Sequence, residues 1–362
     1  MSVADRIYGP VVESLPDLSG RCYAITGTTS GTGFWTAVAA LRKGAACVML
    51  LNRPSARVDA VMEKLKGEGG HSEVVAVACD LQSFASVHEA AAQVQAIAAK
   101  FGGLDGLVNN AGVITGDERT VDGRDVQMQT NHLSHFLLTR LLMPSLEAAA
   151  ALRGEARIVQ HSSGMRAKLG LKGDGNLEAK FFRPGEAGTL GGSRATMARY
   201  HQTKLANSVF AMALHEKLHE ASSKVKSLCA EPGVAETSFG VSRSSGTTPA
   251  GTPPPNSFKF QSGADGACSL IVASFGAAAD SGDMYMPGAL VRNDKGGPMY
   301  HEGMPVKCIT AGAPTPTTEF MTRMFKHEEL TMRKANRELL WAESEAATGE
   351  FRVGRPGGLS KL

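Results

Sequence analysis

Tyr200 and Lys204 stand four residues apart in the chain and could perform acid–base chemistry. The flanking residues predict one helix from Met197 to Leu218, and residues four apart lie on the same face of a helix. A phenol ordinarily has a pKa of about 10, and a fixed positive charge beside it favours the phenolate. The pair therefore predicts a general acid or base that works near neutral pH. A surface pair without function would have the same spacing, so this interpretation needs support from the rest of the chain.

A glycine-rich turn lies between a predicted strand, Cys22–Thr26, and a predicted helix, Phe34–Lys43. A second strand, Cys47–Leu51, follows at the distance expected of a βαβ unit. Glycine lets the backbone turn tightly and approach a ligand closely, while the free N–H groups of the first helical turn attract a pyrophosphate. We therefore expect a dinucleotide here, in contact with Gly27, Thr29, Ser30, Gly31, Thr32 and Gly33.

The residues that follow the second strand indicate which dinucleotide is bound. A site for NAD would place an acidic residue here to hold the ribose 2′-hydroxyl, but this chain has Asn52 and Arg53. A cationic residue at this position favours a 2′-phosphate, so we expect NADP rather than NAD. The alternative is that Arg53 is an ordinary solvated arginine in a loop.

Polar or small residues follow two further predicted strands. Val74–Cys79 forms a strand that ends at Asp80, and Leu104–Val108 forms a strand that runs into Asn109-Asn110-Ala111-Gly112. Doubly wound sheets bind ligands at the carboxyl ends of their strands, so these residues would share one crevice with the glycine turn. We expect Asp80 beside the adenine. The cofactor contacts predicted in this part of the chain are Asp80, Leu81, Asn110 and Gly112.

A fifth predicted strand, Arg157–Gln160, ends in His161-Ser162-Ser163 and carries serine hydroxyls to the same crevice. His161 could serve as a base, but a lone histidine at a strand end is more often packed or solvated, and no triad partners accompany it. A long helix is predicted from Asp125 to Glu147. Asn131 in its middle is a poor helix former, which indicates a local role for its side chain.

Length and composition limit the classes of protein to consider. A chain of 362 residues with 43% hydrophobic and 20% charged residues can form one large α/β domain, and we expect one core with additions. The net charge of +3 without a basic block disfavours nucleic acid, and we expect neither a spanning helix nor a signal peptide. No metal is expected. The cysteines are scattered and indicate buried thiols in a reducing compartment: Cys22, Cys47, Cys79, Cys229, Cys268 and Cys308.

Taken in order, these motifs resemble the short-chain dehydrogenase/reductase family, in particular its retinol-dehydrogenase-like and protochlorophyllide-reductase-like branch. The family's TGxxxGxG loop matches Thr26–Gly33, its NNAG matches Asn109–Gly112, and its YxxxK matches Tyr200–Lys204. Asn131–Phe136 is similar to the NHLGHF segment of the branch. The resemblance covers roughly residues 18–290 and implies a Rossmann-type, doubly wound parallel sheet of seven strands with helices on both faces.

The resemblance also implies a catalytic tetrad of Asn131, Ser163, Tyr200 and Lys204. The family uses the second serine of such a pair, which favours Ser163 over Ser162. Ser163 and Tyr200 would hydrogen-bond the substrate's carbonyl oxygen while NADPH delivers a hydride, and Tyr200 would then donate its proton. Lys204 would hold the nicotinamide ribose and keep the phenol acidic, and Asn131 would fix a water that leads to solvent.

A segment after the sixth predicted strand, Val225–Ala230, is similar to the family's PG segment. A helix, Ala264–Phe275, and a last short strand, Met284–Met286, would complete the sheet. The PG segment would add cofactor contacts from Pro232, Gly233, Val234 and Thr237.

The function that the resemblance implies is NADP(H)-dependent interconversion of a carbonyl and an alcohol, on a lipophilic aldehyde or ketone. A reductase of carbon–carbon double bonds, of the enoyl-CoA or protochlorophyllide type, would use the same scaffold. A non-catalytic NADPH-binding protein could also retain the fold. The family often pairs the Asn131 and Tyr200 helices across a dimer, but its retinol-dehydrogenase-like members vary, so a homo-oligomer and a monomer both fit.

Thr32 stands where the family usually has an apolar residue, two segments also depart from a compact member, and a C-terminal extension follows them. An insertion of about residues 166–199 precedes Tyr200, and a stretch of about 238–260, rich in Gly, Thr and Pro, stands where the family has a mobile lid. Residues 291–352 form a C-terminal extension, in which a helix from Thr317 to Ala347 would close one end of the pocket.

The chain ends in Ser360-Lys361-Leu362 on a flexible tail, 353–362. This tripeptide is a peroxisomal address that an import receptor reads at a free carboxyl terminus. We therefore expect a peroxisome or a related microbody such as a glycosome, with the cytosol as the alternative.

Overall fold

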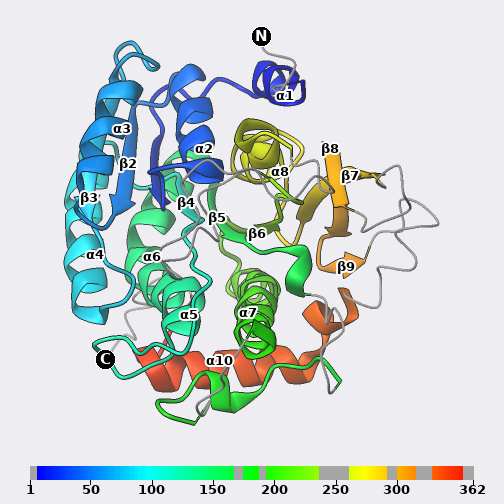
Figure 1. The fold of residues 1–362 in the computed structure, drawn as a ribbon. Coiled ribbons are helices and arrows are strands. Elements are labelled where there is room, and N and C mark those ends of the chain that lie inside the picture. The colour runs from blue at the N-terminus through cyan, green and yellow to red at the C-terminus, as the bar shows by residue number, and fades with distance from the viewer. Residues whose placement is uncertain are drawn as a thin grey trace.

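One nine-stranded sheet organises the computed structural model, which describes residues 6–166, 174–186, 193–235, 261–291, 300–314 and 328–353 (Figure 1). The strand order is β3-β2-β1-β4-β5-β6-β7-β8-β9. The first seven strands along the chain pair in parallel. They are β1 (Cys22–Thr26), β2 (Cys47–Asn52), β3 (Glu73–Ala78), β4 (Gly106–Asn109), β5 (Ala156–His161), β6 (Val225–Ala230) and β7 (Met284–Val291).

The direction of winding reverses between β1 and β4, which are neighbours although the chain forms β2 and β3 between them. In doubly wound sheets this switch point is where ligands bind, at the carboxyl ends of the strands. The predicted class, a Rossmann-type doubly wound α/β sheet, is confirmed. Strand β1 has the predicted bounds, and β2 begins at the predicted residue.

The sheet has two strands beyond the predicted seven. The predicted last strand, Met284–Met286, continues to Val291 in β7, and β8 (Tyr300–Thr310) pairs with it in antiparallel orientation. The short β9 (Ala313–Pro314) then pairs with β8. A bare edge strand leaves a row of unpaired backbone groups, and β8 satisfies those of β7. A seven-stranded sheet is therefore wrong for the whole molecule and right for its parallel part.

Helices cover both faces of the sheet (Figure 1). Those on one face are α2 (Gly31–Arg42), α3 (Ala56–Lys66) and α8 (Gly263–Phe275), with the short α1 (Tyr8–Ser14) beside α8. Those on the other face are α4 (Phe84–Ala99), α6 (Ser134–Arg153) and α7 (Ser193–Glu220). Successive strand residues point to opposite faces, so Leu107 and Val108 belong to different core clusters.

The helix predicted from Asp125 to Glu147 is longer than expected and changes geometry near its start. The short α5 (Val126–Met128) leads into a π-helical turn, Gln129–Leu133, and α6 continues from there. Asn131 lies in this turn. Single π-helical turns inside α-helices occur frequently at functional sites, so the poor helix former marks a place where the helix departs from regular winding.

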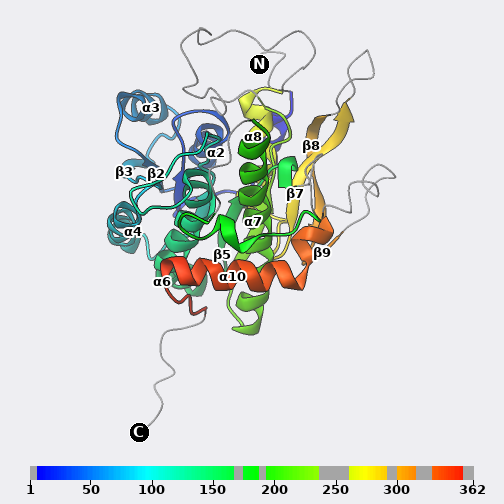
Figure 2. The same ribbon diagram turned by 60° about the horizontal axis from the view of Figure 1, so that its bottom comes forward.

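Helix α10 (Lys334–Thr348) lies across the outer side of α7 and α6 as a third layer (Figure 2). The prediction of a continuous helix from Thr317 to Ala347 is wrong in its described part. The backbone is extended at Arg333, and this break separates α10 from a short helical stretch over 328–332. The Asn336 side chain stabilises this corner, since its Nδ2 donates to a main-chain carbonyl of the preceding stretch at 2.7 Å.

The insertion and the C-terminal extension pack on each other over α6 and α7. The Leu177 N–H donates to the Asn336 side chain at 3.0 Å, and Arg183 forms an ion pair with Glu343 on α10. Phe182 joins the core cluster that contains α6 and α7. The chain itself thus covers part of the face that a dimer through these helices would use, and a homo-oligomer stays a prediction.

Several predicted features lie outside the described residues. These are Thr237, the lid at about 238–260, and the tail from residue 354 with Ser360-Lys361-Leu362, as well as parts of the insertion and of the extension. Within the described segments, no helix is both long enough and apolar enough to cross a membrane. All six cysteines are buried and free, which agrees with the expectation of buried thiols.

Candidate active site

The turn between β1 and α2 approaches the end of β4 so closely that side chains would not fit. Gly27 has a φ of +71°, and a Cβ there would lie 2.8 Å from the Cα of Ala111. A Cβ on Gly33 would collide with the Asn110 side chain and the Gly27 carbonyl. Gly31 begins α2 with a φ of +61°, a conformation that glycine adopts without strain. The turn therefore exposes backbone without side chains at its glycine positions, at the start of α2.

Asn110 fastens this turn to the end of β4. Its Nδ2 donates to the carbonyls of Thr26 at 2.8 Å and of Gly27 at 3.1 Å, and its Oδ1 accepts a bond from the Thr32 hydroxyl at 2.8 Å. The Thr26 hydroxyl accepts bonds from the N–H groups of Asn110 and Ala111. The side chains of Asn110 and Thr32 are thus engaged inside the protein, where they shape the predicted cofactor site.

The two residues at the end of β2 have different environments. Asn52 is buried, and its Oδ1 accepts a bond from the Thr28 N–H at 2.9 Å while its Nδ2 donates to the Thr28 hydroxyl at 2.7 Å. Arg53 is exposed. Asn52 therefore holds the glycine turn in place, and Arg53 is accessible to an anion in solution.

Other predicted cofactor residues also lie at the carboxyl ends of parallel strands. Asp80 and Leu81 follow β3, and the Asp80 carboxylate accepts a bond from a main-chain N–H two residues later at 2.9 Å. Gly233 follows β6 with a φ of +68° and lies between the half-buried Pro232 and Val234. Their contacts with a cofactor stay predictions. The predicted cofactor residues at this edge that are at least partly exposed include Thr29, Ser30 and Gly112.

The two serines at the end of β5 have different partners. The Ser162 hydroxyl is buried and donates to the Lys204 carbonyl at 2.7 Å. The Ser163 hydroxyl lies beside the Tyr200 phenol and lowers its pKa, and Ser163 is half-buried. Ser163 rather than Ser162 is therefore the serine that a substrate beside Tyr200 could reach, and its catalytic role stays a prediction.

Tyr200 and Lys204 share one face of α7, with the lysine Nζ 5.7 Å from the centre of the phenol ring. The Lys204 ammonium donates to the His161 carbonyl at 3.0 Å, and burial lowers the pKa of Lys204 to about 8. Burial raises the pKa of Tyr200 above its ordinary value, and the bond with Ser163 opposes this shift. The net direction is opposite to the expected one, because the cost of burying a phenolate dominates, and an acidifying effect of Lys204 stays a prediction.

Asn131 is fully buried, and its amide is directed to protein groups. Its Oδ1 accepts a bond from the Val113 N–H at 2.7 Å, and its Nδ2 donates to the Val113 carbonyl at 2.9 Å and to the Thr203 hydroxyl at 3.1 Å. Both amide donors are thus used, and the predicted water could bond only to a lone pair of Oδ1. Asn131 connects the loop after β4 to the helical turn that carries Tyr200 and Lys204.

His135 extends this connection to the glycine turn, although no spacing in the sequence signals it. Its Nδ1 lies 3.1 Å from the Asn131 carbonyl, so Nδ1 carries the proton and donates. Its Nε2 therefore accepts a bond from the Thr26 hydroxyl at 2.9 Å. Burial lowers the pKa of His135 to about 4, which leaves the ring neutral at pH 7.

His161, considered as a base from the sequence, contributes its backbone to the site. Its carbonyl accepts bonds from the Lys204 ammonium and from the Asn207 amide, both at 3.0 Å. Burial lowers the pKa of the His161 ring to about 3. The ring is a packed, neutral histidine, which is the outcome that its lone position favours.

Comparison with known proteins relates this fold and site to a protein family. A family model described as short chain dehydrogenase matches residues 21–172. The chain is 31% identical over 238 residues to human retinol dehydrogenase 13, over 65% of this chain and 65% of that protein. It is 26% identical to a solved uncharacterized protein from Mycobacterium paratuberculosis, with a TM-score of 0.63 over 94% of this chain and 98% of that one. These matches support a member of the short-chain dehydrogenase/reductase family.

The family and the retinol-dehydrogenase-like branch predicted from the motifs are therefore confirmed. The chain spans 55% to 62% of the length of the first curated relatives that it matches. L-sorbose reductase from Gluconobacter frateurii, solved in complex with NADPH and L-sorbose, shares the fold at 21% identity, with a TM-score of 0.52 over 75% of this chain and 95% of that one.

Two buried arginines flank the predicted catalytic residues. Arg199 precedes Tyr200 and pairs with Asp117 at 2.8 Å and with Asp125 at 3.2 Å. Arg166, in the turn after β5, pairs with two glutamates. Sequence reasoning missed both, because the acidic partners lie far along the chain. The sequence signal is a basic residue next to a motif, and it does not identify the acidic partners.

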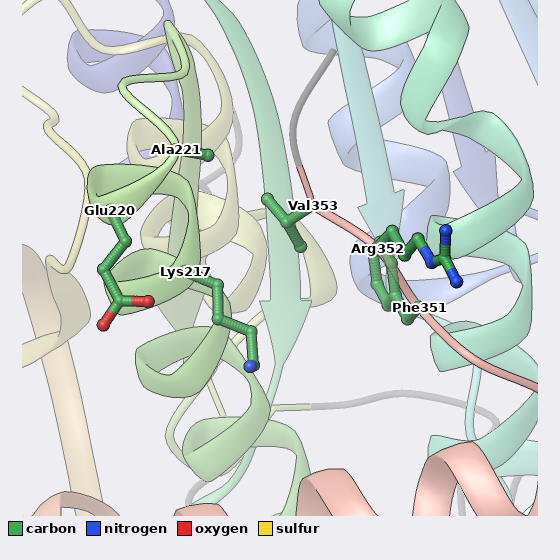
Figure 3. Close-up of a pocket in the computed structure, with 6 residues that line it drawn as sticks. All are labelled: Lys217, Glu220, Ala221, Phe351, Arg352 and Val353. Carbon is green, nitrogen blue, oxygen red and sulfur yellow. The ribbon is translucent and has the colours of Figure 1, made fainter. Parts of the chain in front are cut away.

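A surface hollow of about 520 Å³ lies at the other end of α7 (Figure 3). Tyr200 lies 17 residues before Lys217 on the same helix, which corresponds to roughly 25 Å. The hollow is therefore separate from the predicted catalytic residues. The residues that line it are Lys217, Glu220, Ala221, Phe351, Arg352 and Val353.

Proposed function

We propose that the chain is an NADP(H)-dependent oxidoreductase that interconverts a carbonyl and an alcohol, on a lipophilic aldehyde or ketone. One observation carries the proposal. The Ser163 hydroxyl and the Tyr200 phenol lie beside each other at the carboxyl end of β5, with Lys204 next to the phenol on α7. Two neighbouring hydroxyl donors can bind one carbonyl oxygen together. The lipophilic substrate class is supported by a relative named for retinol, an apolar alcohol.

The crevice at the ends of β1, β2 and β4 fits a phosphorylated dinucleotide. The bare turn at Gly27 and Gly33 lets backbone approach a pyrophosphate, and the first N–H groups of α2 face such a group at Gly31. Arg53 is exposed where a ribose 2′-phosphate would lie, and a guanidinium binds phosphate well. When bound, NADPH supplies the hydride for the carbonyl carbon. The NADPH complex of the same-fold L-sorbose reductase supports this cofactor.

Tyr200 is suited to donate a proton in the direction of reduction. Burial raises the pKa of Tyr200, so the phenol is protonated at neutral pH and ready to donate to a developing alkoxide. The Ser163 hydroxyl stabilises negative charge on the same oxygen as it develops. Together they bind the oxygen atom and supply its proton.

Lys204 provides the positive charge for the phenolate that remains. With a pKa of about 8 it is mostly protonated at pH 7, and its Nζ lies 5.7 Å from the phenol ring. One of its three donors is bound by the His161 carbonyl, which leaves two for a ribose. The hydrogen bond to the His161 carbonyl thus holds the Lys204 side chain at the end of β5.

The test is a Tyr200→Phe variant assayed with NADPH and retinal or aliphatic aldehydes. Turnover should be abolished while NADPH affinity stays nearly unchanged, because only the proton donor is lost. Tyr23→Phe is the matched control, since Tyr23 is a buried tyrosine in the core cluster on the face of the sheet away from α7. Wild-type turnover in Tyr200→Phe would contradict the proposal.

The same assay separates the alternative functions. Oxidation of NADPH with 2-enoyl thioesters but not with aldehydes would identify a reductase of carbon–carbon double bonds. NADPH binding without turnover of either class would identify a non-catalytic binding protein. Both results would overturn the carbonyl assignment.

A peroxisomal or related microbody location is a further proposal, and it rests only on Ser360-Lys361-Leu362. The address requires a free carboxylate after Leu362. A fluorescent protein fused ahead of the intact tail should collect in peroxisomes, and removal of the tripeptide should return it to the cytosol. A uniform distribution with the tail intact would contradict the proposal.

A further inference from the structure

Arg166 is buried with two carboxylates at its guanidinium. Its Nη1 pairs with Glu231, which follows β6, and its Nη2 pairs with Glu328. The side chains of Arg166, Glu231 and Glu328 are 2%, 1% and 5% exposed. A guanidinium fork can engage two carboxylates at once, whereas a lysine ammonium is a single point charge. The three residues form one buried ionic cluster with one negative charge in excess.

This cluster is attached to the catalytic serine through the main chain. The Arg166 Nη1 donates to the Ser163 carbonyl at 3.1 Å, and the Arg166 N–H donates to the same carbonyl at 2.9 Å. The Ser163 hydroxyl accepts a bond from the Met165 N–H at 3.3 Å. Ser163 is thus held at its carbonyl by Arg166 while its hydroxyl lies beside the Tyr200 phenol. A shift of the guanidinium would move the peptide unit of the serine.

Glu328 reaches the cluster from a distant part of the chain. It lies 162 residues after Arg166 and begins the last described segment of the chain, 328–353. One turn later, the Thr331 and Ser208 hydroxyls are hydrogen-bonded at 2.9 Å, which attaches the same stretch to α7. The extension therefore contacts both parts of the catalytic pair, the serine turn through Glu328 and the tyrosine helix through Thr331.

The geometry points to Glu328 and Arg166 as positioning residues, through which the C-terminal extension holds the Ser163 turn against Tyr200. This inference rests on the proposed function, because the two residues position the serine and carry out no chemistry themselves. A purely structural cluster would affect only the amount of folded protein. Positioning predicts a lower kcat per folded molecule with a KM for NADPH that changes little, because the cofactor crevice is formed by other strands.

Glu328→Gln is the variant that tests this most directly. It removes one carboxylate and leaves Arg166 paired with Glu231, so no lone charge is buried. We expect kcat for aldehyde reduction to fall about 10- to 100-fold, the scale expected when a catalytic group is slightly misplaced. We also expect faster amide hydrogen exchange at Met165 and Arg166, because their N–H groups bond to Ser163.

Glu343→Gln is the matched control. Glu343 also joins the extension to a distant segment, through its ion pair with Arg183, but this pair involves no residue of the serine turn. Neither kcat nor the exchange at Met165 and Arg166 should change. Arg166→Lys is the second variant if Glu328→Gln does not fold: it keeps a cation but loses the fork, and the same two changes are expected.

Two outcomes would overturn the inference. One is a wild-type kcat per folded molecule in the Glu328→Gln or Arg166→Lys variant, and the other is unchanged exchange at Met165 and Arg166. A wild-type protein that reduces no carbonyl would contradict the proposed function instead. In that case the exchange difference between Glu328→Gln and Glu343→Gln still decides whether the extension holds the serine turn.

Discussion

The cofactor crevice and the proposed catalytic segment of this protein are stabilised by different kinds of contact. In the crevice, neutral side chains fasten the glycine turn to the ends of β2 and β4: Thr26, Thr32, Asn52 and Asn110. Around the Ser163–Tyr200 pair, the side chains that attach the catalytic groups to the rest of the fold include two buried arginines, Arg166 and Arg199, each between two carboxylates.

This difference predicts that substitutions in the two regions cost unequal amounts of stability. A neutral hydrogen bond contributes about 1 kcal/mol net, whereas removing one partner of a buried ion pair costs about 3–5 kcal/mol. The distances along the chain differ as well. Asn52 and Thr28 are 24 residues apart, whereas Arg166 and Glu328 are 162 apart. The bond between Asn52 and Thr28 therefore lies within one βαβ unit, and Asn110 bonds to Thr32 from 78 residues away, while the catalytic segment also depends on the C-terminal extension.

Arg199→Met should produce the largest effect, because Asp117 and Asp125 would lose their buried cation. We expect the free energy of unfolding, measured with urea, to fall by about 3–5 kcal/mol. Arg183→Met is the control: Arg183 pairs with Glu343 at the surface, so stability should be nearly unchanged. A loss in Arg199→Met no greater than that of a neutral hydrogen bond would remove the difference between the two regions.

Arg53→Ala should weaken the binding of NADPH about 10- to 100-fold, the range for a hydrogen bond to a charged group. Binding of NADH should change little, because it lacks the 2′-phosphate. Dissociation constants from fluorescence titration measure both. Lys64→Ala removes an exposed cation from α3 and serves as the control. Equal losses for the two cofactors would show that Arg53 is an ordinary solvated arginine.

Acid should destabilise the protein through three buried histidines. Burial lowers the pKa of His132, His135 and His161 to about 3, 4 and 3 respectively. In the unfolded chain histidine titrates near 6.5, so below that pH the unfolded chain binds more protons than the folded protein. Stability is therefore lost as the pH falls from about 6.5 towards 4, by about 1.4 kcal/mol per pH unit for each histidine.

His132→Leu tests this dependence. Urea unfolding between about pH 4.5 and 6.5 should show a slope smaller by one histidine's share. His88→Leu changes an exposed histidine and should leave the slope as it is. An unchanged slope in His132→Leu would mean that the buried ring is protonated as easily in the folded protein as in the unfolded chain.

Thr32→Val should have the smallest effect, since it removes only the neutral bond to the Asn110 side chain. We expect a loss of about 1 kcal/mol in the free energy of unfolding. Thr36→Val, one turn later, is the control, because the Thr36 hydroxyl bonds only to the carbonyl of its own helix. A loss of several kcal/mol in Thr32→Val would show that the neutral contacts are as indispensable as the buried ions.

Motifs and periodicity predicted the parts of the site that are local in the chain. The spacing of Tyr200 and Lys204 determines their common helix face, and the turn from Gly27 to Gly33 follows a strand with the predicted bounds. These predictions succeed because helix period and glycine conformations depend on neighbouring residues alone. The direction of the Tyr200 pKa shift failed, because burial is a property of the folded molecule.

The sequence by itself therefore determined the parallel sheet, the glycine turn and the tyrosine–lysine pair, since each follows from a short pattern. Only the tertiary structure decided that Asn52 holds Thr28, that β8 extends the sheet, and that Glu328 meets Arg166. Contacts of this kind depend on which distant segments come together, and no residue spacing records that. Burial then sets the cost of each charge, because water is excluded from those contacts.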